Sequence, residues 1–89
     1  MIEADVEDYL ARRVKARGGE VRKVAWLGRK HAPDRLVMLG CKHPLVELKR
    51  PGEKPCAGQL REHGRLRAAG FEVFVIDTRE GVDRLVDAL

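Results

Sequence analysis

The chain has 89 residues, of which 36% are charged, and 18 Lys and Arg residues against 14 Asp and Glu residues give a net charge of +4. This length predicts one domain over residues 1–89, with a small core that a second copy of the chain would help to stabilise. The modest positive charge favours a polyanionic partner such as nucleic acid, although an ordinary charged surface has the same composition.

The cysteine content and the hydropathy pattern exclude several classes of protein. Cys41 and Cys56 are the only cysteines, and they lack the spacing of a zinc site or a disulfide framework. No apolar stretch approaches the roughly 20 residues of a membrane span. The acidic start, MIEADVEDYL, has no signal-peptide features. We therefore expect reduced thiols, a cytoplasmic location and no membrane partner.

The hydrophobic pattern predicts seven elements. Val6, Leu10 and Val14, spaced by four residues, predict a first helix that a glycine pair ends. A partly alternating strand follows, and then two short apolar runs around a Gly- and Pro-containing turn predict a hairpin. A helix closed by Gly70, the strand FEVFVI and a short amphipathic helix, for which Asp77 is the expected cap, complete the series. The expected ranges are residues 3–17, 21–26, 35–39, 45–49, 56–69, 71–76 and 79–89.

This order, α-β-β-β-α-β-α, places the chain in the α/β class. The β-α-β step around the second helix predicts two parallel strands joined by a right-handed crossover. The hairpin before it predicts antiparallel pairing. We therefore expect a mixed β-sheet flanked by helices.

A set of charged residues interrupts the hairpin. Asp34 precedes one strand, and Glu47 and Lys49 occupy alternate positions of the next, so both side chains leave the same face of the sheet. Nearby carboxylates repel, and Mg²⁺ prefers their oxygens and waters as ligands. A lysine beside a metal can position water or stabilise a phosphate. The pattern is compatible with metal-assisted phosphodiester hydrolysis, but on spacing alone it favours a surface hairpin with a Glu–Lys cross-strand pair, because such charge arrangements are frequent by chance.

The surrounding residues resemble a known family. The stretches GRKHAPDRLV, VELKRPGEKP and QLREHGRLRAAGFEVFVID are similar to the virus-type replication-repair nucleases, VRR-NUC, of the PD-(D/E)XK superfamily. Pro33-Asp34 matches the PD, Glu47-Leu48-Lys49 matches the ExK, and Gln59 and His63 fall on the following helix. The resemblance runs from about Glu3 to Asp77, which is nearly the whole chain.

The resemblance implies a restriction-endonuclease-like fold and a Mg²⁺ or Mn²⁺ site. Asp34, Glu47 and the backbone carbonyl of Leu48 correspond to metal ligands, Lys49 to the residue that positions the attacking water, and Gln59 to a supporting helix residue. Related nucleases also place an acidic residue of the first helix at the site.

Glu3 and Glu7 are the candidates for that acidic residue, one helical turn apart. We favour Glu7 because it lies beside the apolar Val6 and Leu10, although either residue also suits a helix N-terminus. His31 stands where the family often has Gly, so the loop before Asp34 has its own shape.

Basic residues surround these motifs and predict contacts with DNA phosphates, which supply affinity without sequence information. Aromatic residues make up only 4% of the chain, which favours duplex backbone over stacked single strands. The expected DNA-binding residues are Arg29, Lys30, Arg35, Arg50, Lys54 and His63.

The resemblance therefore implies a metal-dependent DNA endonuclease of the stand-alone phage type. Such proteins are similar to Holliday-junction resolvases, and a homodimer would supply the two sites that a two-fold symmetric junction needs. The host compartment would be the cytoplasm of a bacterial or phage-infected cell. The alternatives are a flap or general DNA nuclease, and a non-catalytic DNA-binding assembly subunit with a nuclease fold.

Overall fold

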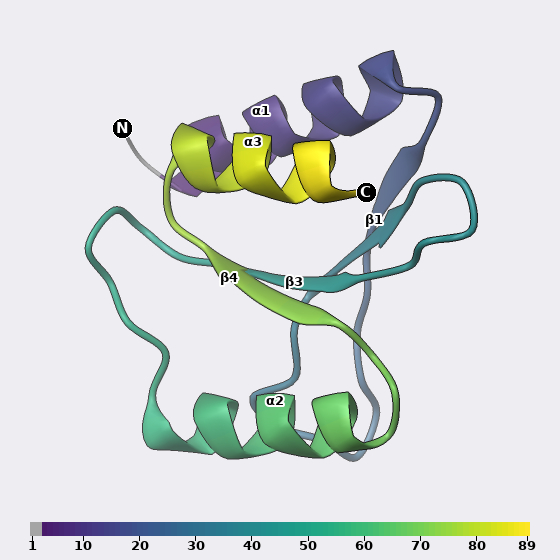
Figure 1. Ribbon diagram of the computed structural model, residues 1–89. Coiled ribbons are helices and arrows are strands. Elements are labelled where there is room, and N and C mark those ends of the chain that lie inside the picture. Colours follow the sequence, from purple (N-terminus) through teal and green to yellow (C-terminus); the bar gives the residue numbers. More distant parts are fainter. Residues whose placement is uncertain (1–2) are drawn as a thin grey trace.

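The computed structural model describes residues 3–89, without the side chain of Glu3, and has the predicted order of seven elements (Figure 1). The N-terminal helix and three strands precede the second helix, and a fourth strand and a third helix follow it. The elements are α1 (Glu3–Ala16), β1 (Glu20–Lys23), β2 (Arg35–Met38), β3 (Leu45–Leu48), α2 (Ala57–Ala68), β4 (Val73–Ile76) and α3 (Arg79–Ala88).

The four strands form one mixed sheet in the order β1-β2-β3-β4. The pairs β1–β2 and β2–β3 are antiparallel, and β3–β4 is parallel, with α2 as the crossover between them. The mixed α/β sheet expected from the sequence is thus confirmed.

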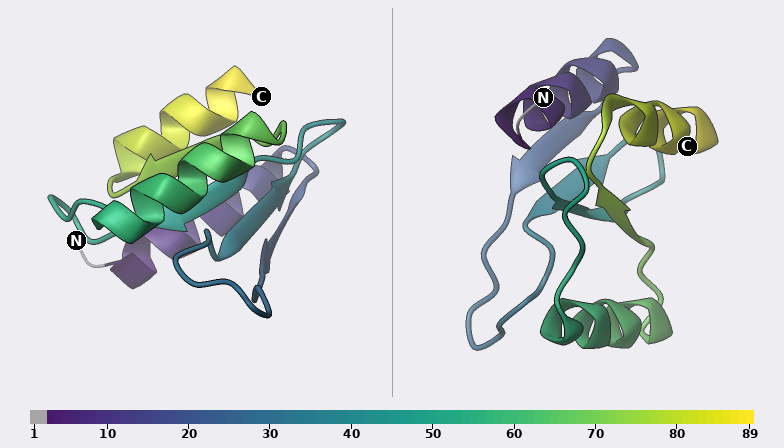
Figure 2. Two further views of the ribbon diagram at one scale, coloured as in Figure 1. Left: turned by 90° about the horizontal axis from the view of Figure 1, so that it is seen from below. Right: turned by 90° about the vertical axis from the view of Figure 1, so that its left-hand side faces the viewer.

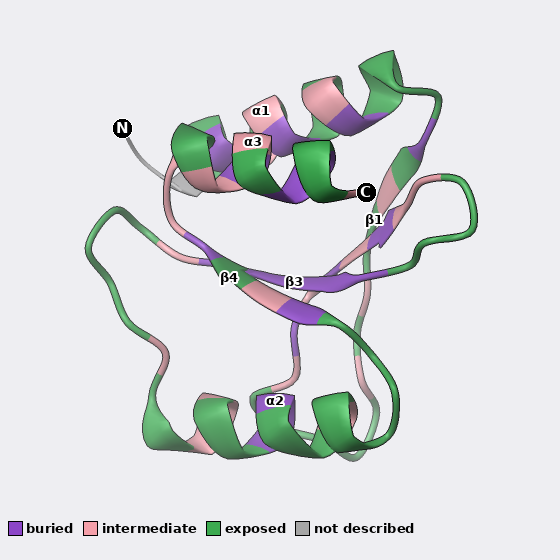
Figure 3. Ribbon diagram, viewed as in Figure 1, coloured by how far each residue is buried: buried purple, intermediate pink, exposed green. Residues whose placement is uncertain are grey.

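Helices cover both faces of this sheet. α1 and α3 lie together on one face and α2 lies on the other (Figures 1 and 2). The larger core lies between the sheet and the α1–α3 pair, as the buried residues in Figure 3 show. Its fully buried members include Val6, Leu10 and Val14, the three residues whose spacing predicted the first helix. No helix of the described residues is long and apolar enough to cross a membrane.

Strand β3 is buried on both faces because it lies between helices. Val46 and Leu48 point into the core with α1 and α3. Leu45 and Glu47 alternate with them and therefore face α2. All four residues are buried, so Glu47 is a charged residue in the most enclosed strand of the sheet.

The expected strand at residues 21–26 is wrong at its C-terminal end, because β1 stops at Lys23. Val24 N–H donates one further hydrogen bond to the carbonyl of Asp34, at 3.0 Å, and the chain then leaves the sheet. Trp26 lies in the loop, where its indole Nε1–H donates to the carbonyl of Pro33 at 2.7 Å. A tertiary contact therefore overrides the strand propensity of this segment.

The start of α3 differs from the sequence expectation in one residue. Asp77 was expected to cap this helix, but Thr78 is the N-cap and its Oγ1 accepts from Gly81 N–H at 3.0 Å. Asp77 instead accepts a hydrogen bond from Gly52 N–H, also at 3.0 Å. The end of β4 is thereby fastened to the loop that follows β3.

Candidate active site

The sheet register places Asp34 opposite Glu47. Antiparallel pairing joins Arg35 to Val46, and Leu36 to Leu45. One residue further along the same register, Asp34 faces Glu47, with both side chains on the α2 face of the sheet. The hairpin thus brings together the two carboxylates that are 13 positions apart in the sequence (47 − 34).

The hydrogen-bond pattern makes this a close pair. Val37 N–H donates to the carbonyl of Pro44 at 3.0 Å, which marks that pair as hydrogen-bonded. Hydrogen-bonded and non-hydrogen-bonded pairs alternate along an antiparallel ladder, so the two carboxylates share a non-hydrogen-bonded pair. In such a pair, opposite side chains approach most closely.

The same ladder favours the carbonyl of Leu48 as an additional oxygen ligand. Leu45 and Lys49 donate their N–H groups toward β4, so the backbone groups of Leu48 point toward β2. The residue opposite Leu48 in the continued register is Pro33, which has no N–H group to donate. The ladder therefore supplies no donor to this carbonyl, which lies beside the carboxylate pair.

The two oxygens of Asp34 have different environments. Oδ2 lies 2.8 Å from Nη1 of Arg35. Oδ1 is buried and accepts no hydrogen bond from any described residue. A buried carboxylate oxygen without a donor is costly, and a cation is one way to satisfy it.

Glu47 lies against α2, where its side chain contacts a histidine. The residue is 7% exposed, and its Oε1 lies 3.5 Å from Nε2 of His63, which is fully buried. Burial lowers the pKa of His63 from its ordinary value of 6.5, and the positive charges of Arg67 and Lys49 lower it further, against a smaller opposite effect of Glu62. The imidazole is therefore neutral at pH 7 and does not cancel the charge of Glu47.

Lys49 lies on the same side as the carboxylates. It follows β3 directly, and its backbone N–H donates to the carbonyl of Ile76 at 2.9 Å. It is two residues after Glu47, so the alternation of side chains along an extended chain places it on the α2 face, and its positive charge lowers the pKa of His63. The structure thus gathers Asp34, Glu47 and Lys49 at one end of the sheet.

Arg35 has a different placement from the one expected of a DNA contact. Its side chain is 8% exposed, and Nη2 lies 2.9 Å from Oε1 of Glu7 on α1, while Nη1 contacts Asp34. A buried guanidinium between two carboxylates is not available to an approaching phosphate. Glu7 accordingly reaches the site through Arg35, and Lys23 lies 3.6 Å from the same Glu7 oxygen.

Two residues of α2, His63 and Gln59, were also singled out in the sequence, and only His63 lies where its expected role does not suit it. His63 was expected to bind DNA, but its full burial against the sheet removes it from solvent. Gln59 was expected to support the catalytic site, and its Oε1 accepts a hydrogen bond from Cys56 N–H at 3.0 Å. That contact is half of a capping box at the start of α2, so Gln59 fixes the helix that presents His63 to Glu47.

The remaining basic residues are exposed on two loops. Arg29 and Lys30 lie in the loop that leads to Asp34, and Arg50 and Lys54 lie in the loop that follows Lys49. Arg29 Nε lies 3.8 Å from Oε2 of Glu62 on α2. One loop therefore leads directly into Asp34, and the other begins just after Glu47 and Lys49.

The loop before Asp34 has a contact that the sequence reasoning missed. His31 has a φ of +67°, a conformation that favours glycine, and its ring packs over Gly58 of α2. Its Nδ1 lies 3.8 Å from Sγ of Cys56. Because the family often has Gly at the position of His31, the sequence indicated an unusual backbone conformation there. Nothing in the sequence indicated the contact of His31 with α2.

The donor set fits a hard divalent cation. Among the described residues, no group of three or more His, Cys, Asp and Glu side chains has a metal-binding arrangement. Two carboxylates and one backbone carbonyl suit an ion such as Mg²⁺, which binds few protein oxygens and keeps several waters. The buried Oδ1 of Asp34, without a protein donor, is consistent with this fit.

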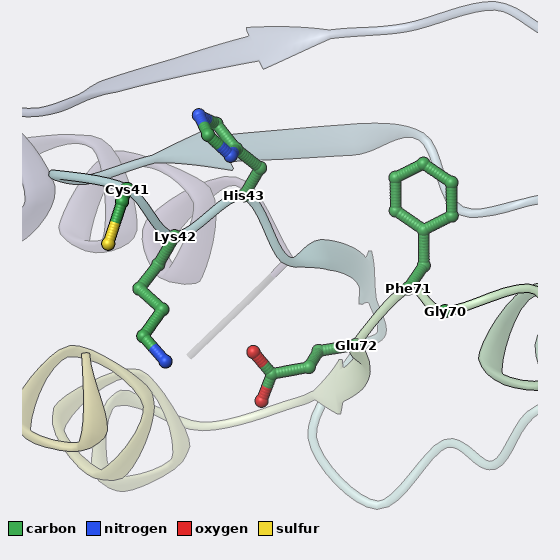
Figure 4. A pocket seen from close by; sticks show the side chains of 6 residues that line it. All are labelled: Cys41, Lys42, His43, Gly70, Phe71 and Glu72. Carbon is green, nitrogen blue, oxygen red and sulfur yellow. The ribbon is translucent and has the colours of Figure 1, made fainter.

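A hollow on the surface lies away from these residues. It is lined by Cys41, Lys42, His43, Gly70, Phe71 and Glu72 (Figure 4). These residues belong to the turns that precede β3 and β4, whereas Asp34 precedes β2 and Lys49 follows β3. The hollow is therefore at the opposite end of the sheet from the carboxylates.

The mixed sheet and the facing carboxylates with a neighbouring lysine define the nuclease fold of the PD-(D/E)XK class. Among solved structures, a "VRR_NUC domain" matches with a TM-score of 0.86 and 42% identity, over 96% of this chain and 94% of that one. The phage protein named "Putative nuclease p44", from Acyrthosiphon pisum secondary endosymbiont phage 1, is 46% identical over 79 residues, 88% of this chain and 85% of that protein. No family model matches the chain. The chain belongs to the VRR-NUC family of nucleases.

Proposed function

We propose that the protein is a Mg²⁺- or Mn²⁺-dependent endonuclease that hydrolyses phosphodiester bonds in DNA, with residues 1–89 acting as one nuclease domain. The observation that supports this most directly is the cross-strand position of Asp34 and Glu47, with Lys49 on the same face. Two facing carboxylates repel each other and any phosphate, so they serve a DNA-binding surface only together with a cation. Membership of a nuclease family supports the same activity.

Each site residue has a role in this proposal. Asp34, Glu47 and the carbonyl of Leu48 would hold the ion. The ion, when bound, supplies a more acidic water and neutralises charge at the phosphate. The ammonium group of Lys49 orients the attacking water and stabilises the charge that develops on the phosphate oxygens. Gln59 keeps the start of α2 in place through its hydrogen bond to Cys56.

The two basic loops are the proposed DNA contacts. Arg29, Lys30, Arg50 and Lys54 are exposed on either side of the carboxylates and can approach two stretches of phosphate backbone. Such contacts position a duplex and do not select a sequence. Arg35 and His63 are left out of this surface because both are buried.

We further propose that the substrate is branched duplex DNA and that the enzyme is a Holliday-junction resolvase acting as a homodimer. A four-way junction has two-fold symmetry, and two symmetric cuts require two sites related by the same symmetry. The small size of the chain, 89 residues, supports partnering between two copies.

The test is cleavage of end-labelled DNA with Mg²⁺, Mn²⁺ or EDTA on a four-way junction, a flap, plain duplex and single strand. We expect paired symmetric nicks in the junction only with a divalent metal. Metal-dependent cutting of flaps or duplex instead would keep the chemistry and exclude the junction role. Binding without any cutting would support the non-catalytic assembly subunit.

A variant of Asp34 separates chemistry from binding. Asp34→Asn removes a proposed metal ligand, so we expect cleavage to be lost while DNA binding in a gel-shift assay is kept or strengthened. Asp8→Asn, at an exposed position of α1, is the matched control and should cut normally. Cleavage that is unchanged in Asp34→Asn would remove this residue from the mechanism.

A further inference from the structure

Arg35 is a buried, positively charged residue beside the carboxylate pair, and it has no part in the chemistry proposed above. Arg35 is 8% exposed at its side chain and lies between an oxygen of Asp34, at 2.8 Å, and an oxygen of Glu7, at 2.9 Å. A guanidinium presents its donors in a rigid planar fork, so binding two carboxylates fixes the position of both.

We propose that Arg35 is a positioning residue for metal binding, which holds one oxygen of Asp34 so that the other is presented to the ion. This inference rests on the proposed function. Oδ2 of Asp34 is bound by Arg35, whereas Oδ1 is buried without a hydrogen-bond donor among the described residues. With Oδ2 bound, the orientation of Oδ1 is set before a metal arrives.

The charge of Arg35 alone would oppose metal binding, and Glu7 corrects this. Arg35 and Asp34 together have no net charge, whereas the group of Glu7, Arg35 and Asp34 has a charge of −1. Lys23 lies 3.6 Å from Glu7, but its side chain is 74% exposed, so solvent screens its effect. Glu7 therefore acts through Arg35 in this arrangement.

The positions of Glu7, Arg35 and Asp34 depend on the core that lies between α1 and the sheet. Glu7 follows Val6, which is fully buried, so its backbone is fixed on α1. Arg35 begins β2 and pairs with Lys23 of β1 and Val46 of β3. The orientation of Asp34 thus depends on the packing of α1 against the sheet.

The test is the affinity for Mn²⁺, measured by calorimetry without DNA, in Arg35→Met, Arg35→Lys and Glu7→Gln. Replacing groups that orient a metal ligand weakens metal binding by about 10- to 100-fold, and we expect a loss of this size for Arg35→Met and Glu7→Gln. Arg35→Lys keeps the charge without the fork and should lie between them and the wild type. Arg22→Met is the control, because Arg22 is an exposed residue of β1, and it should bind Mn²⁺ normally.

Two results would overturn the inference. Tighter Mn²⁺ binding by Arg35→Met would show that Arg35 only competes with the metal for Asp34. Unchanged Mn²⁺ binding with a lower melting temperature would show a structural role alone. If Arg35→Met fails to fold by circular dichroism, the lysine variant decides between these outcomes and the proposed one.

The double variant Glu7→Gln/Arg35→Met tests whether Glu7 acts through Arg35. The two effects should then not add, and the double variant should bind Mn²⁺ about as well as Arg35→Met alone. Additive losses would make Glu7 an independent contributor and contradict the proposal. A wild type that neither binds Mn²⁺ nor cuts DNA would reject the proposed function itself, whereas a cutting wild type with unaffected variants rejects only the inference.

Discussion

At the scale of single residues, the oxygens that the candidate active site can offer to a metal ion depend on which side-chain atoms already have a protein partner. Asp34 shows this best, because Arg35 binds Oδ2 while buried Oδ1 has no hydrogen-bond donor among the described residues. Glu47, on the facing strand, lies beside a histidine that burial keeps neutral. This neutral histidine does not cancel the negative charge of Glu47.

Lys49 gives a test of the chemistry that is separate from metal binding. Lys49→Met removes the ammonium group proposed to orient water and stabilise charge on the phosphate, so we expect the cleavage rate to fall by about 10²- to 10³-fold. Affinity for Mn²⁺ should be kept, because both carboxylates remain. Lys42→Met, at the opposite end of the sheet, is the matched control. Single-turnover cleavage and calorimetry measure the two quantities, and an unchanged rate would contradict the role.

At the scale of elements, α2 and the loop before Asp34 form one supporting unit. The loop is closed by Trp26 and Pro33, and His31 packs over Gly58 of the helix. The capping box of Gln59 fixes where this helix begins. The PD motif therefore depends on a helix that is more than 20 residues later in the chain (57 − 34 = 23).

Two glycines of α2 test this dependence. A Cβ at Gly58 would lie 2.6 Å from Cδ2 of His31, whereas a Cβ at Gly64 meets nothing within 4 Å. We expect Gly58→Ala to destabilise the fold by about 1–3 kcal/mol through overpacking and to slow cleavage. Gly64→Ala should stabilise the fold by about 0.5–1 kcal/mol because alanine favours the helix.

Urea unfolding measures both free energies, and the double variant His31→Gly/Gly58→Ala gives the decisive comparison. It removes the ring and places glycine at a positive φ, so stability should recover relative to Gly58→Ala. No recovery would mean that the ring of His31 is not the obstacle.

At the scale of the whole molecule, the two ends of the sheet carry different features. Paired carboxylates and basic loops lie at one end, and the hollow of Figure 4 lies at the other. Four basic residues flank the carboxylates, in a chain whose net charge is +4. DNA affinity should therefore depend strongly on salt and on these two loops.

Arg50 tests the proposed DNA surface. Each phosphate contact contributes about −0.9 to the slope of log affinity against log salt concentration, so Arg50→Ala should reduce the slope by about one. Arg84→Ala is the control, because this exposed residue belongs to α3 on the other face of the sheet. Fluorescence anisotropy at several salt concentrations gives the slope. Equal slopes for wild type and Arg50→Ala would exclude Arg50 from the DNA surface.

The sequence by itself determined the order of elements, the mixed sheet and the nuclease family. Periodicity was sufficient here, because each apolar face has to be buried and the spacing of Val6, Leu10 and Val14 permits only one helical face. The PD and ExK positions were also readable, since a hairpin brings its strand ends together. The structure places Asp34, Glu47 and Lys49 at one end of the sheet, although their catalytic roles stay predictions.

Only the tertiary structure decided which charged residues face solvent and which face each other. Arg35 and His63 look like DNA contacts in a linear sequence, yet each is buried by an element distant in the chain. The end of β1 at Lys23 and the contact of His31 with Gly58 have the same origin. Local patterns fix local conformation, whereas the partner of a long polar side chain depends on packing between elements, which no local pattern specifies.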